Sequence, residues 1–286
     1  MATREVNGSV RPGGAHPETA HGAGGDRQPL TPTRAPVYDD RTMNRLIALS
    51  YSPWSEKARW TLRHHRIDFR ETEYVPMLGM PWLRAMTRRW SGRVTVPTLL
   101  ADGQVYMDSW EIARWAEANG QGAPLFPTEH AAAIAHWNDR SERVMSAGRA
   151  LATRRTANDA GAQMEALPPF IPGAVRGLAR PVAAAGVRYF TNKYDLAAGT
   201  DAERIEAIRN ELLSLREALA GAETLWGPFT FAELSMAMAL QFVAPVEGRR
   251  PSLKPATRRC WTQAELAAEF PDLLAWRDAL LARHQP

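Results

Sequence analysis

The order of apolar and polar positions divides the chain into an earlier part of mixed strands and helices and a later part that is wholly helical. Short apolar runs typical of strands occur at 45–50, 68–75, 95–100 and 104–107. Helical patterns occur at 53–66 and 109–118, and a Met- and Trp-rich stretch at 77–90 stands between the second and third strands. The predicted order is β-α-β-α-β-β-α.

Turn residues mark two boundaries in this first part. The dipeptide Asp102-Gly103 separates the last two strands and predicts a tight hairpin. Gly120 follows the last predicted helix, and we expect it to take the left-handed conformation that commonly ends helices.

From residue 131 onward the pattern is helical. Five apolar residues at steps of three and four predict one buried stripe: Ile205, Ile208, Leu212, Leu215 and Leu219. Thr230 with Glu233, and Thr262 with Glu265, have the T-x-x-E spacing of capping boxes, so each pair predicts the start of a helix.

Residues 1–41 differ from the rest of the chain. They include 6 Gly, 5 Pro, 5 Arg and 5 acidic residues with little apolar periodicity. Such a segment cannot bury enough surface to offset its ordering entropy, so we expect a disordered tail. Met43 stands just before the first strand and is a second candidate for the translation start.

Composition narrows the classes of function. The chain has 35 Lys and Arg against 31 Asp and Glu, and a net charge of +4 over 286 residues is too small to indicate a nucleic-acid-binding protein. The single cysteine, Cys260, cannot form an internal disulfide, and no metal-binding spacing occurs. No apolar run reaches the roughly 20 residues of a membrane span. We therefore expect a cytoplasmic protein with no metal, no nucleic-acid partner and no stable membrane insertion.

Five motifs, in this order and spacing, resemble those of the cytosolic glutathione transferases over most of 46–284. They are S-P-W-S-E-K-A-R at 52–59, T-V-P-T-L at 95–99, M-D-S-W-E-I at 107–112, F-T-F-A-E-L at 229–234 and F-P-D-L-L-A-W at 270–276. The resemblance implies an α/β thioredoxin-like, glutathione-binding domain at 42–120, a linker at 121–130 and an all-helical domain at 131–286. It also implies a homodimer.

Ser52 and Pro53 allow two interpretations. Ser52 followed by Pro at the first helical position is a good N-cap. The resemblance, which at S-P-W is to the tau class, implies instead that Ser52 is catalytic and holds the glutathione thiolate at a helix N-terminus, where the pKa of a thiol is lowered. Trp54 flanks this position as a binding residue, and Tyr51 and Ser55 are the alternatives to Ser52.

The second motif concerns the backbone of Val96. In the family the bond corresponding to Val96-Pro97 is cis, and Val96 pairs with the cysteinyl residue of glutathione as a short added strand. The alternative is a trans proline at a strand edge. Many members have a polar residue such as Lys two positions before the proline, where this chain has Thr95; Arg93 is a weak substitute.

The third motif, Asp108-Ser109, also allows two interpretations. Asp108 with Glu111 has the spacing of a capping box. The resemblance implies that Ser109 binds the carboxylate, and Asp108 the ammonium, of the γ-glutamyl end of glutathione. Both roles are compatible.

Outside these motifs, three features carry hypotheses. The segment 164–194 exceeds the family's usual length; it is either a helical excursion with a solvated basic edge or a lid over the second substrate. His64 and His65 are interpreted as cations at a helix end. Cys260, beside Arg258 and Arg259, is a candidate for a lowered thiol pKa.

Together these features predict an enzyme that conjugates glutathione, as co-substrate, to an apolar electrophile. The alternatives on the same fold are a glutathione-dependent isomerase or β-etherase, and a non-catalytic thiol-binding or scaffold protein.

Overall fold

A computed structural model describes residues 43–76, 78–167, 185–186, 199–248 and 253–286. The tail at 1–41 and most of the segment at 164–194 lie outside the described residues, so the hypotheses about them are untested.

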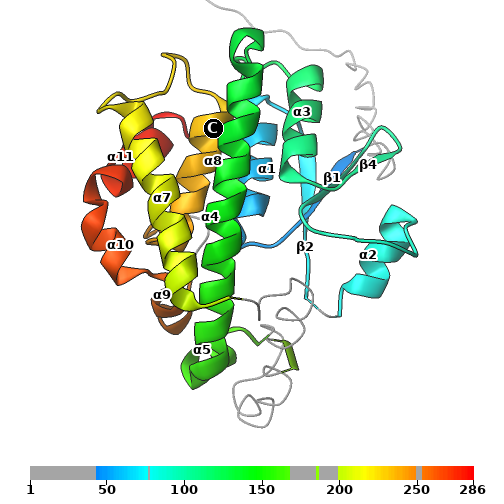
Figure 1. The fold of residues 1–286 in the computed structure, drawn as a ribbon. Coiled ribbons are helices and arrows are strands. Elements are labelled where there is room, and N and C mark those ends of the chain that lie inside the picture. The colour runs from blue at the N-terminus through cyan, green and yellow to red at the C-terminus, as the bar shows by residue number, and fades with distance from the viewer. Residues whose placement is uncertain (1–42, 77, 168–184, 187–198, 249–252) are drawn as a thin grey trace, which may run out of the picture. The chain divides into compact units, whose positions relative to one another are not determined.

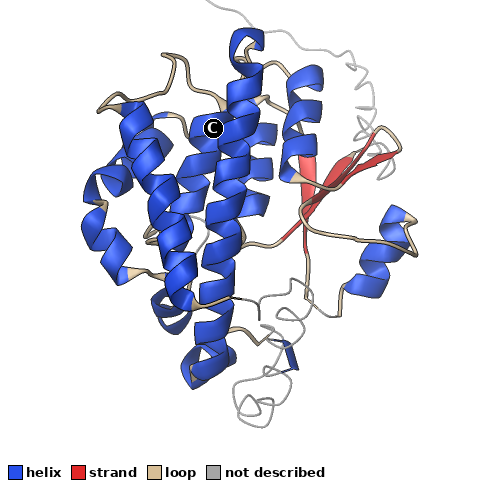
Figure 2. Cartoon of the chain, in the orientation of Figure 1, coloured by secondary structure: helices blue, strands red, loops and turns tan. Residues whose placement is uncertain are grey.

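The first part of the chain forms a four-stranded mixed sheet with the order β2-β1-β3-β4, in which β1 pairs parallel with β2 and antiparallel with β3 (Figures 1 and 2). The elements are β1 (Asn44–Ala48), α1 (Pro53–His64), β2 (Phe69–Glu73), α2 (Met80–Thr87), β3 (Thr98–Ala101), β4 (Gln104–Tyr106) and α3 (Ser109–Asn119). The predicted order β-α-β-α-β-β-α and the thioredoxin-like fold class are confirmed.

Strand β1 is buried on both faces because its side chains alternate between two clusters. Leu46 packs with Leu62 of α1 and Ile112 of α3. Ile47 packs instead with Leu83 of α2 and other apolar residues. Helices α1 and α3 therefore cover one face of the sheet and α2 covers the other. Successive side chains of a strand point to opposite faces, so neighbouring residues of β1 pack against different helices.

The hairpin between β3 and β4 confirms the turn prediction. Asp102 and Gly103 have φ angles of 52° and 71°, as both central residues of a type I′ turn require.

Gly120 does not take the predicted left-handed conformation. Its φ and ψ are −109° and −172°, which is extended backbone. The reason for glycine is proximity: an added Cβ would lie 2.4 Å from Cβ and 2.5 Å from the carbonyl oxygen of His65. The next residue, Gln121, donates its N–H to that carbonyl at 2.9 Å, so the chain after α3 is held against the end of α1.

This geometry predicts that Gly120→Ala costs about 3 kcal/mol of unfolding free energy, because a backbone atom must move to admit the methyl group. Gly120→Asn should cost more than Gly120→Ala. A left-handed helix stop would give the opposite order, since Asn tolerates that conformation better than Ala. Gly92→Ala is the control, with φ of 76° but open space around it, and should cost only about 1 kcal/mol. Urea unfolding of the four proteins measures these differences.

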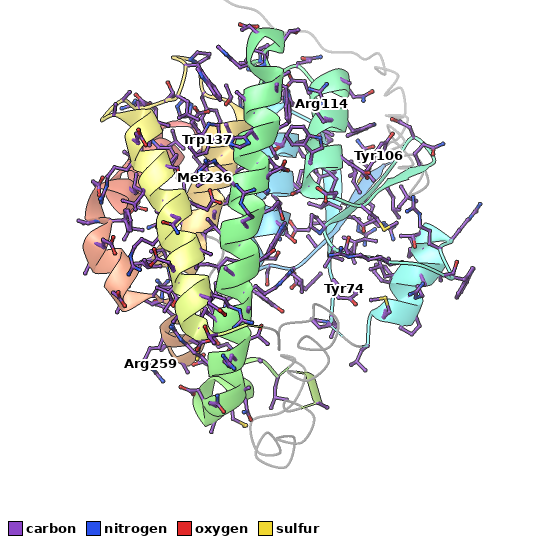
Figure 3. The ribbon with its side chains drawn as sticks, in the orientation of Figure 1. Tyr74, Tyr106, Arg114, Trp137, Met236 and Arg259 are labelled. Atoms are coloured by element: carbon purple, nitrogen blue, oxygen red, sulfur yellow. The ribbon has the colours of Figure 1, made fainter. Side chains whose placement is uncertain are left out.

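The second part of the chain is mostly helical, as predicted. Its elements are η1 (Thr128–His130), α4 (Ala131–Asn158), α5 (Ala160–Glu165), α7 (Asp201–Leu219), α8 (Phe231–Ala239), η3 (Leu240–Phe242), α9 (Pro255–Trp261), α10 (Ala264–Glu269) and α11 (Pro271–Arg283). Every residue of α8 is buried. In Figure 3, Trp137 of α4 and Met236 of α8 lie among these helices, and both are buried in the main apolar core.

The predicted stripe on α7 forms part of this core. Ile208, Leu212, Leu215 and Leu219 are buried, and Ile205 packs partly buried against them. No helix in the described ranges is both long and apolar enough to cross a membrane.

The capping predictions have mixed outcomes. Thr230 and Glu233 form the expected capping box at the start of α8. The prediction for Thr262 is wrong, because its hydroxyl donates to the carbonyl of Arg258 at the end of α9, and α10 begins only at Ala264. A further capping box, Thr200 with Glu203, starts α7.

Candidate functional site

Ser52 lies at the start of α1, where its hydroxyl caps the helix only weakly. The residue is 7% exposed, and its Oγ accepts the N–H of Ser55 at 3.4 Å. Among the described residues, this hydroxyl donates no hydrogen bond. Its proton is therefore available to an acceptor at the positive end of α1.

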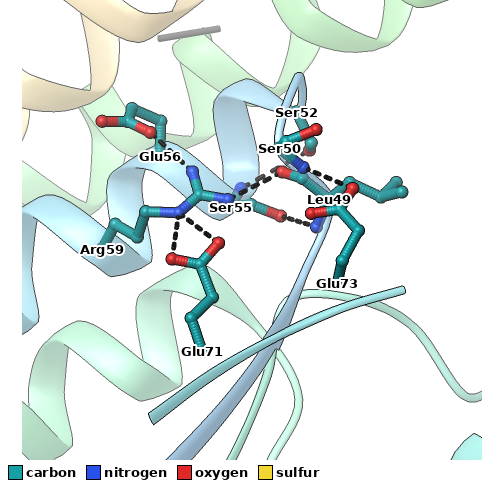
Figure 4. Close-up of polar contacts among 8 residues, drawn as sticks. All are labelled: Leu49, Ser50, Ser52, Ser55, Glu56, Arg59, Glu71 and Glu73. Atoms are coloured by element: carbon teal, nitrogen blue, oxygen red, sulfur yellow. Dashed lines mark hydrogen bonds and ion pairs between the residues drawn. The ribbon is translucent and has the colours of Figure 1, made fainter. Parts of the chain in front are cut away.

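The loop that carries Ser52 is fixed by a buried arginine (Figure 4). Arg59, fully buried, donates from Nε to both oxygens of Glu71 at 2.9 Å and from Nη1 to Glu56 at 2.6 Å. Its Nη2 donates to the carbonyl of Leu49 at 2.9 Å. Because strand β2, helix α1 and the loop share one guanidinium, the position of Ser52 is set by rigid elements.

Ser55 and Tyr51, the alternatives to Ser52, have other partners. The Oγ of Ser55 accepts the N–H of Leu49 at 3.1 Å and is fully buried. Tyr51 is half-buried and packs edge-on against Trp261, with ring centroids 6.4 Å apart. The hydroxyl of Ser55 thus holds the loop through Leu49. Ser52 is therefore the better candidate for a hydroxyl that donates a hydrogen bond to a thiolate.

The bond between Val96 and Pro97 is cis. Within the described residues, no hydrogen bond between backbone atoms uses the N–H or the C=O of Val96, which precedes β3. Ile47 of β1 pairs with Thr98 of β3, and extending this register by two residues places Leu49 opposite Val96. The open backbone edge at Val96 and the Ser52 loop therefore lie at the same end of the sheet.

Thr95 connects this edge to the start of α3. Its hydroxyl donates to the carbonyl of Met107 at 3.0 Å, directly before Asp108. Thr95 thus has a structural partner, and Arg93 is exposed. The hydrogen bond brings the Val96 edge and the Asp108-Ser109 pair together.

Asp108 and Ser109 begin α3. The Oδ1 of Asp108 accepts the N–H of Trp110 at 2.7 Å, while Glu111 accepts the N–H of Met107 at 3.1 Å. Asp108 is a cap as predicted, but the reciprocal bond of the capping box goes to Met107, one residue earlier. Asp108 is partly exposed to solvent, but the protein around its carboxyl removes enough water to raise the pKa of that group. The negative charge of Glu142 raises the pKa further, while the hydrogen bond from the Trp110 N–H lowers it.

Ser109 is the most informative residue at this helix end. It is 1% exposed, and its Oγ has no hydrogen-bond partner among the residues that the structure describes. A buried hydroxyl without a partner loses its hydrogen bonds to water without replacement, which costs about 1–3 kcal/mol. At the N-terminus of a helix, the group that would satisfy it is an anion such as a carboxylate.

Trp54 faces the helical part of the chain. Its indole Nε1 donates to Glu142 of α4 at 2.6 Å, and its ring packs edge-on against Phe242 with centroids 5.9 Å apart. Trp54 is thus engaged by α4 and η3. Among the described residues, neither this hydrogen bond nor this ring contact of Trp54 is with the Val96 edge.

Sequence reasoning missed Lys57, one turn after Trp54. Its side chain is fully buried, and Nζ donates to Glu142 at 2.8 Å and to Asn138 at 3.0 Å. The charges of Lys57 and Glu142 both act on the pKa of Asp108. The only sequence signal is a lysine within an otherwise amphipathic helix start, so neither its burial nor its partners on α4 could be found from spacing.

The predictions for the titration of His65 and of Cys260 are wrong. Burial foremost, and then the charge of His64, lower the pKa of His65, which is 1% exposed and lies 3.1 Å from Glu117. This environment disfavours the expected cation. Burial raises the pKa of the Cys260 thiol above its ordinary value and outweighs the nearby arginines, so the pKa is not lowered as the sequence suggested.

Comparisons of the chain with known protein families and solved structures agree with this fold. Residues 51–119 match the family model of the glutathione S-transferase N-terminal domain. No curated protein matches the chain. A glutathione S-transferase of Ceriporiopsis subvermispora, solved in complex with glutathione, is 17% identical with a TM-score of 0.57, covering 86% of this chain and 98% of its own.

Two further solved structures have the same fold. A β-etherase from Sphingobium sp. strain SYK-6 is 16% identical with a TM-score of 0.54, over 84% of this chain and 96% of its own. A tau class glutathione S-transferase from mango, Mangifera indica, is 12% identical with a TM-score of 0.51, over 84% and 89%. Identities this low establish the fold alone. The chain therefore matches the glutathione S-transferase N-terminal domain over residues 51–119, and its described part shares the fold of these solved structures.

Proposed function

We propose that the protein is a glutathione-dependent transferase that joins the glutathione thiol to an apolar electrophile. The observation that carries the proposal is the buried, unpartnered hydroxyl of Ser109 at the start of α3. A carboxylate such as that of the γ-glutamyl end of glutathione fits this position, with Asp108 beside it for the ammonium.

The backbone at Val96 supports the same ligand. Its N–H and C=O are free of partners among the described backbone atoms and lie at an edge tied to Asp108 through Thr95. A peptide added there as a short strand would satisfy both groups. Glutathione is a peptide with a carboxylate and an ammonium at one end, so it matches both features.

Ser52 supplies the chemistry in this proposal. The Ser52 hydroxyl donates a hydrogen bond to the glutathione sulfur, and the positive N-terminal end of α1 points toward the same sulfur. Both interactions stabilise the thiolate relative to the thiol. The thiolate then attacks the electrophile, forming a C–S bond while a leaving group departs or a double bond takes up the electron pair. The rate gain comes from thiolate formation and from holding two reactants together.

The second substrate is proposed to be apolar because aromatic side chains surround the Ser52 loop. Tyr51, Trp54, Phe242 and Trp261 contact one another next to it, and Phe242 and Trp261 stack with centroids 4.4 Å apart. A β-etherase reaction is the second candidate, favoured by the fold neighbour of that name. The homodimer, the cytoplasmic location and the lid at 164–194 stay predictions.

Titration calorimetry tests the proposal. Wild-type protein should bind glutathione saturably, and Ser109→Ala should raise Kd about tenfold, because the variant loses a hydrogen bond to a charged group. Ser109→Ala leaves the cap made by Asp108 intact. The matched control is Ser214→Ala on α7, whose hydroxyl donates to the carbonyl of Asn210, and its Kd should equal that of wild type.

Two results would count against the proposal. Absence of saturable heat with wild type would favour the scaffold alternative. Equal affinity of wild type and Ser109→Ala would remove Ser109 from the site.

A further inference from the structure

The segment that contains α2 carries exposed apolar side chains that the proposed function does not use. Leu78 is 66% exposed, Trp82 37% and Trp90 72%. Within the described ranges, Leu213 on α7 is the remaining large apolar side chain of this kind. Three such side chains within residues 78–90 are a local concentration, unlike the scattered single residues that occur on every protein surface.

Helix α2 does not need these exposed side chains to pack against the sheet. Helix α2 already buries one face against the sheet through Leu83 and Thr87, and Met80 and Met86 pack against the same cluster. Trp82 lies on the exposed side of α2, and Trp90 lies beyond its end. In Figure 1, α2 stands on the side of the sheet away from α7 and α11.

All charged residues of the same segment are basic. From residue 74 to 101 the sequence has four arginines and no acidic residue. Arg84 donates to the carbonyls of Arg89 and Gly92, each at 3.1 Å, and so fixes the loop that carries Trp90. The other three arginines are exposed, and in the described part of the chain none of them forms an ion pair: Arg88, Arg89 and Arg93.

We propose that this α2 patch (Leu78, Trp82, Arg88, Arg89, Trp90 and Arg93) is a docking surface for an anionic lipid membrane. Indole rings prefer the headgroup level of a bilayer, where one part is apolar and another wet. Arginines at that level pair with lipid phosphates, which gives attraction to anionic leaflets. The contact is peripheral, because α2 is far too short to span a bilayer.

Two other occupants fit the patch less well. In a contact between this patch and the same patch of a second copy, the three exposed arginines of each copy would share one interface with no acidic residue from 74–101 to pair with them. A nucleic acid would pair with the arginines, but it would leave Leu78 without an apolar partner. A membrane satisfies the charges and the apolar side chains together.

Co-sedimentation of the full chain with lipid vesicles tests the proposal. The protein should bind vesicles that contain phosphatidylglycerol, bind pure phosphatidylcholine far less, and dissociate as salt is raised. Trp90→Ser with Arg89→Gln should lower the partition coefficient at least tenfold, since one arginine alone accounts for about fivefold. The matched control, Leu213→Ser with Arg63→Gln, changes an exposed apolar and an exposed basic residue outside the patch and should bind as wild type does.

Several outcomes would overturn the proposal. These are equal binding to both vesicle types, no binding to either, or equal losses in the patch variant and its control. Patch-dependent binding to a single-stranded oligonucleotide without vesicle binding would assign the surface to nucleic acid. Patch-dependent self-association in sedimentation velocity without vesicle binding would assign it to a second copy. Equal melting temperatures of the variants and wild type establish that the comparison is between folded proteins.

Discussion

Replacing Ser52 with Asp is expected to leave the protein folded. The pKa of the thiol of bound glutathione should rise, and turnover at neutral pH should fall at least tenfold. Asp caps a helix as well as Ser does, so the start of α1 is retained. Its negative charge, however, opposes the thiolate, and each unit of increase in the thiol pKa corresponds to about 1.4 kcal/mol. The measurement is thiolate absorbance of the glutathione complex against pH.

Ser52→Ala separates the two roles of the hydroxyl further. It removes the cap and the donor together, so about 1 kcal/mol of stability is lost under either interpretation. Only the thiolate role makes the thiol pKa rise in this variant as well. If the Asp variant binds glutathione and titrates as wild type does, Ser52 is a cap alone and Tyr51 becomes the candidate to test.

Glu142→Ala should lower the free energy of unfolding by about 3 kcal/mol, because it strips the main counter-charge from a buried ammonium. Lys57 is fully buried and, within the described part of the chain, would keep only Asn138 as a hydrogen-bond partner. The indole of Trp54 would lose its acceptor in the same variant. Urea unfolding gives the difference.

A matched control and a rescue make this prediction specific. Glu211 on α7 also accepts from two cations, Arg140 and Arg143, but their side chains are 23% and 52% exposed. Glu211→Ala should therefore cost under about 1 kcal/mol. Adding Lys57→Met to Glu142→Ala should restore most of the lost stability, because the uncompensated charge is gone. A loss as small as that of Glu211→Ala would contradict the prediction.

Local signals were sufficient to predict much of the fold. The strands, the Asp102-Gly103 hairpin, the α7 stripe and the α8 capping box depend on neighbours within a few residues, and each formed as expected. Predictions failed where a distant segment decides the outcome. Gly120 is required by its contact with His65, and the pKa of Cys260 is set by burial more than by the adjacent arginines.

The candidate site divides in the same way. Ser52 and Asp108 could be located from cap spacing, because a cap is a property of a few consecutive residues. The link from Lys57 and Trp54 to α4 joins residues 81–88 positions apart, and no periodicity in either helix records it. The hydrogen bond from Thr95 to Met107 is likewise visible only once β3 and α3 are placed.

The link between α1 and α4 has a consequence for dissecting or recombining the chain. A fragment that ends before α4 would present Lys57 and the Trp54 indole to water without Glu142 and Asn138, on the helix that begins at Ser52. A chimera that grafts the helical part of a relative onto this sheet part would need a carboxylate and an amide at the same two places on α4. These two acceptors decide whether the two parts fit together, so a design that exchanges the helical part while retaining the sheet part must keep them.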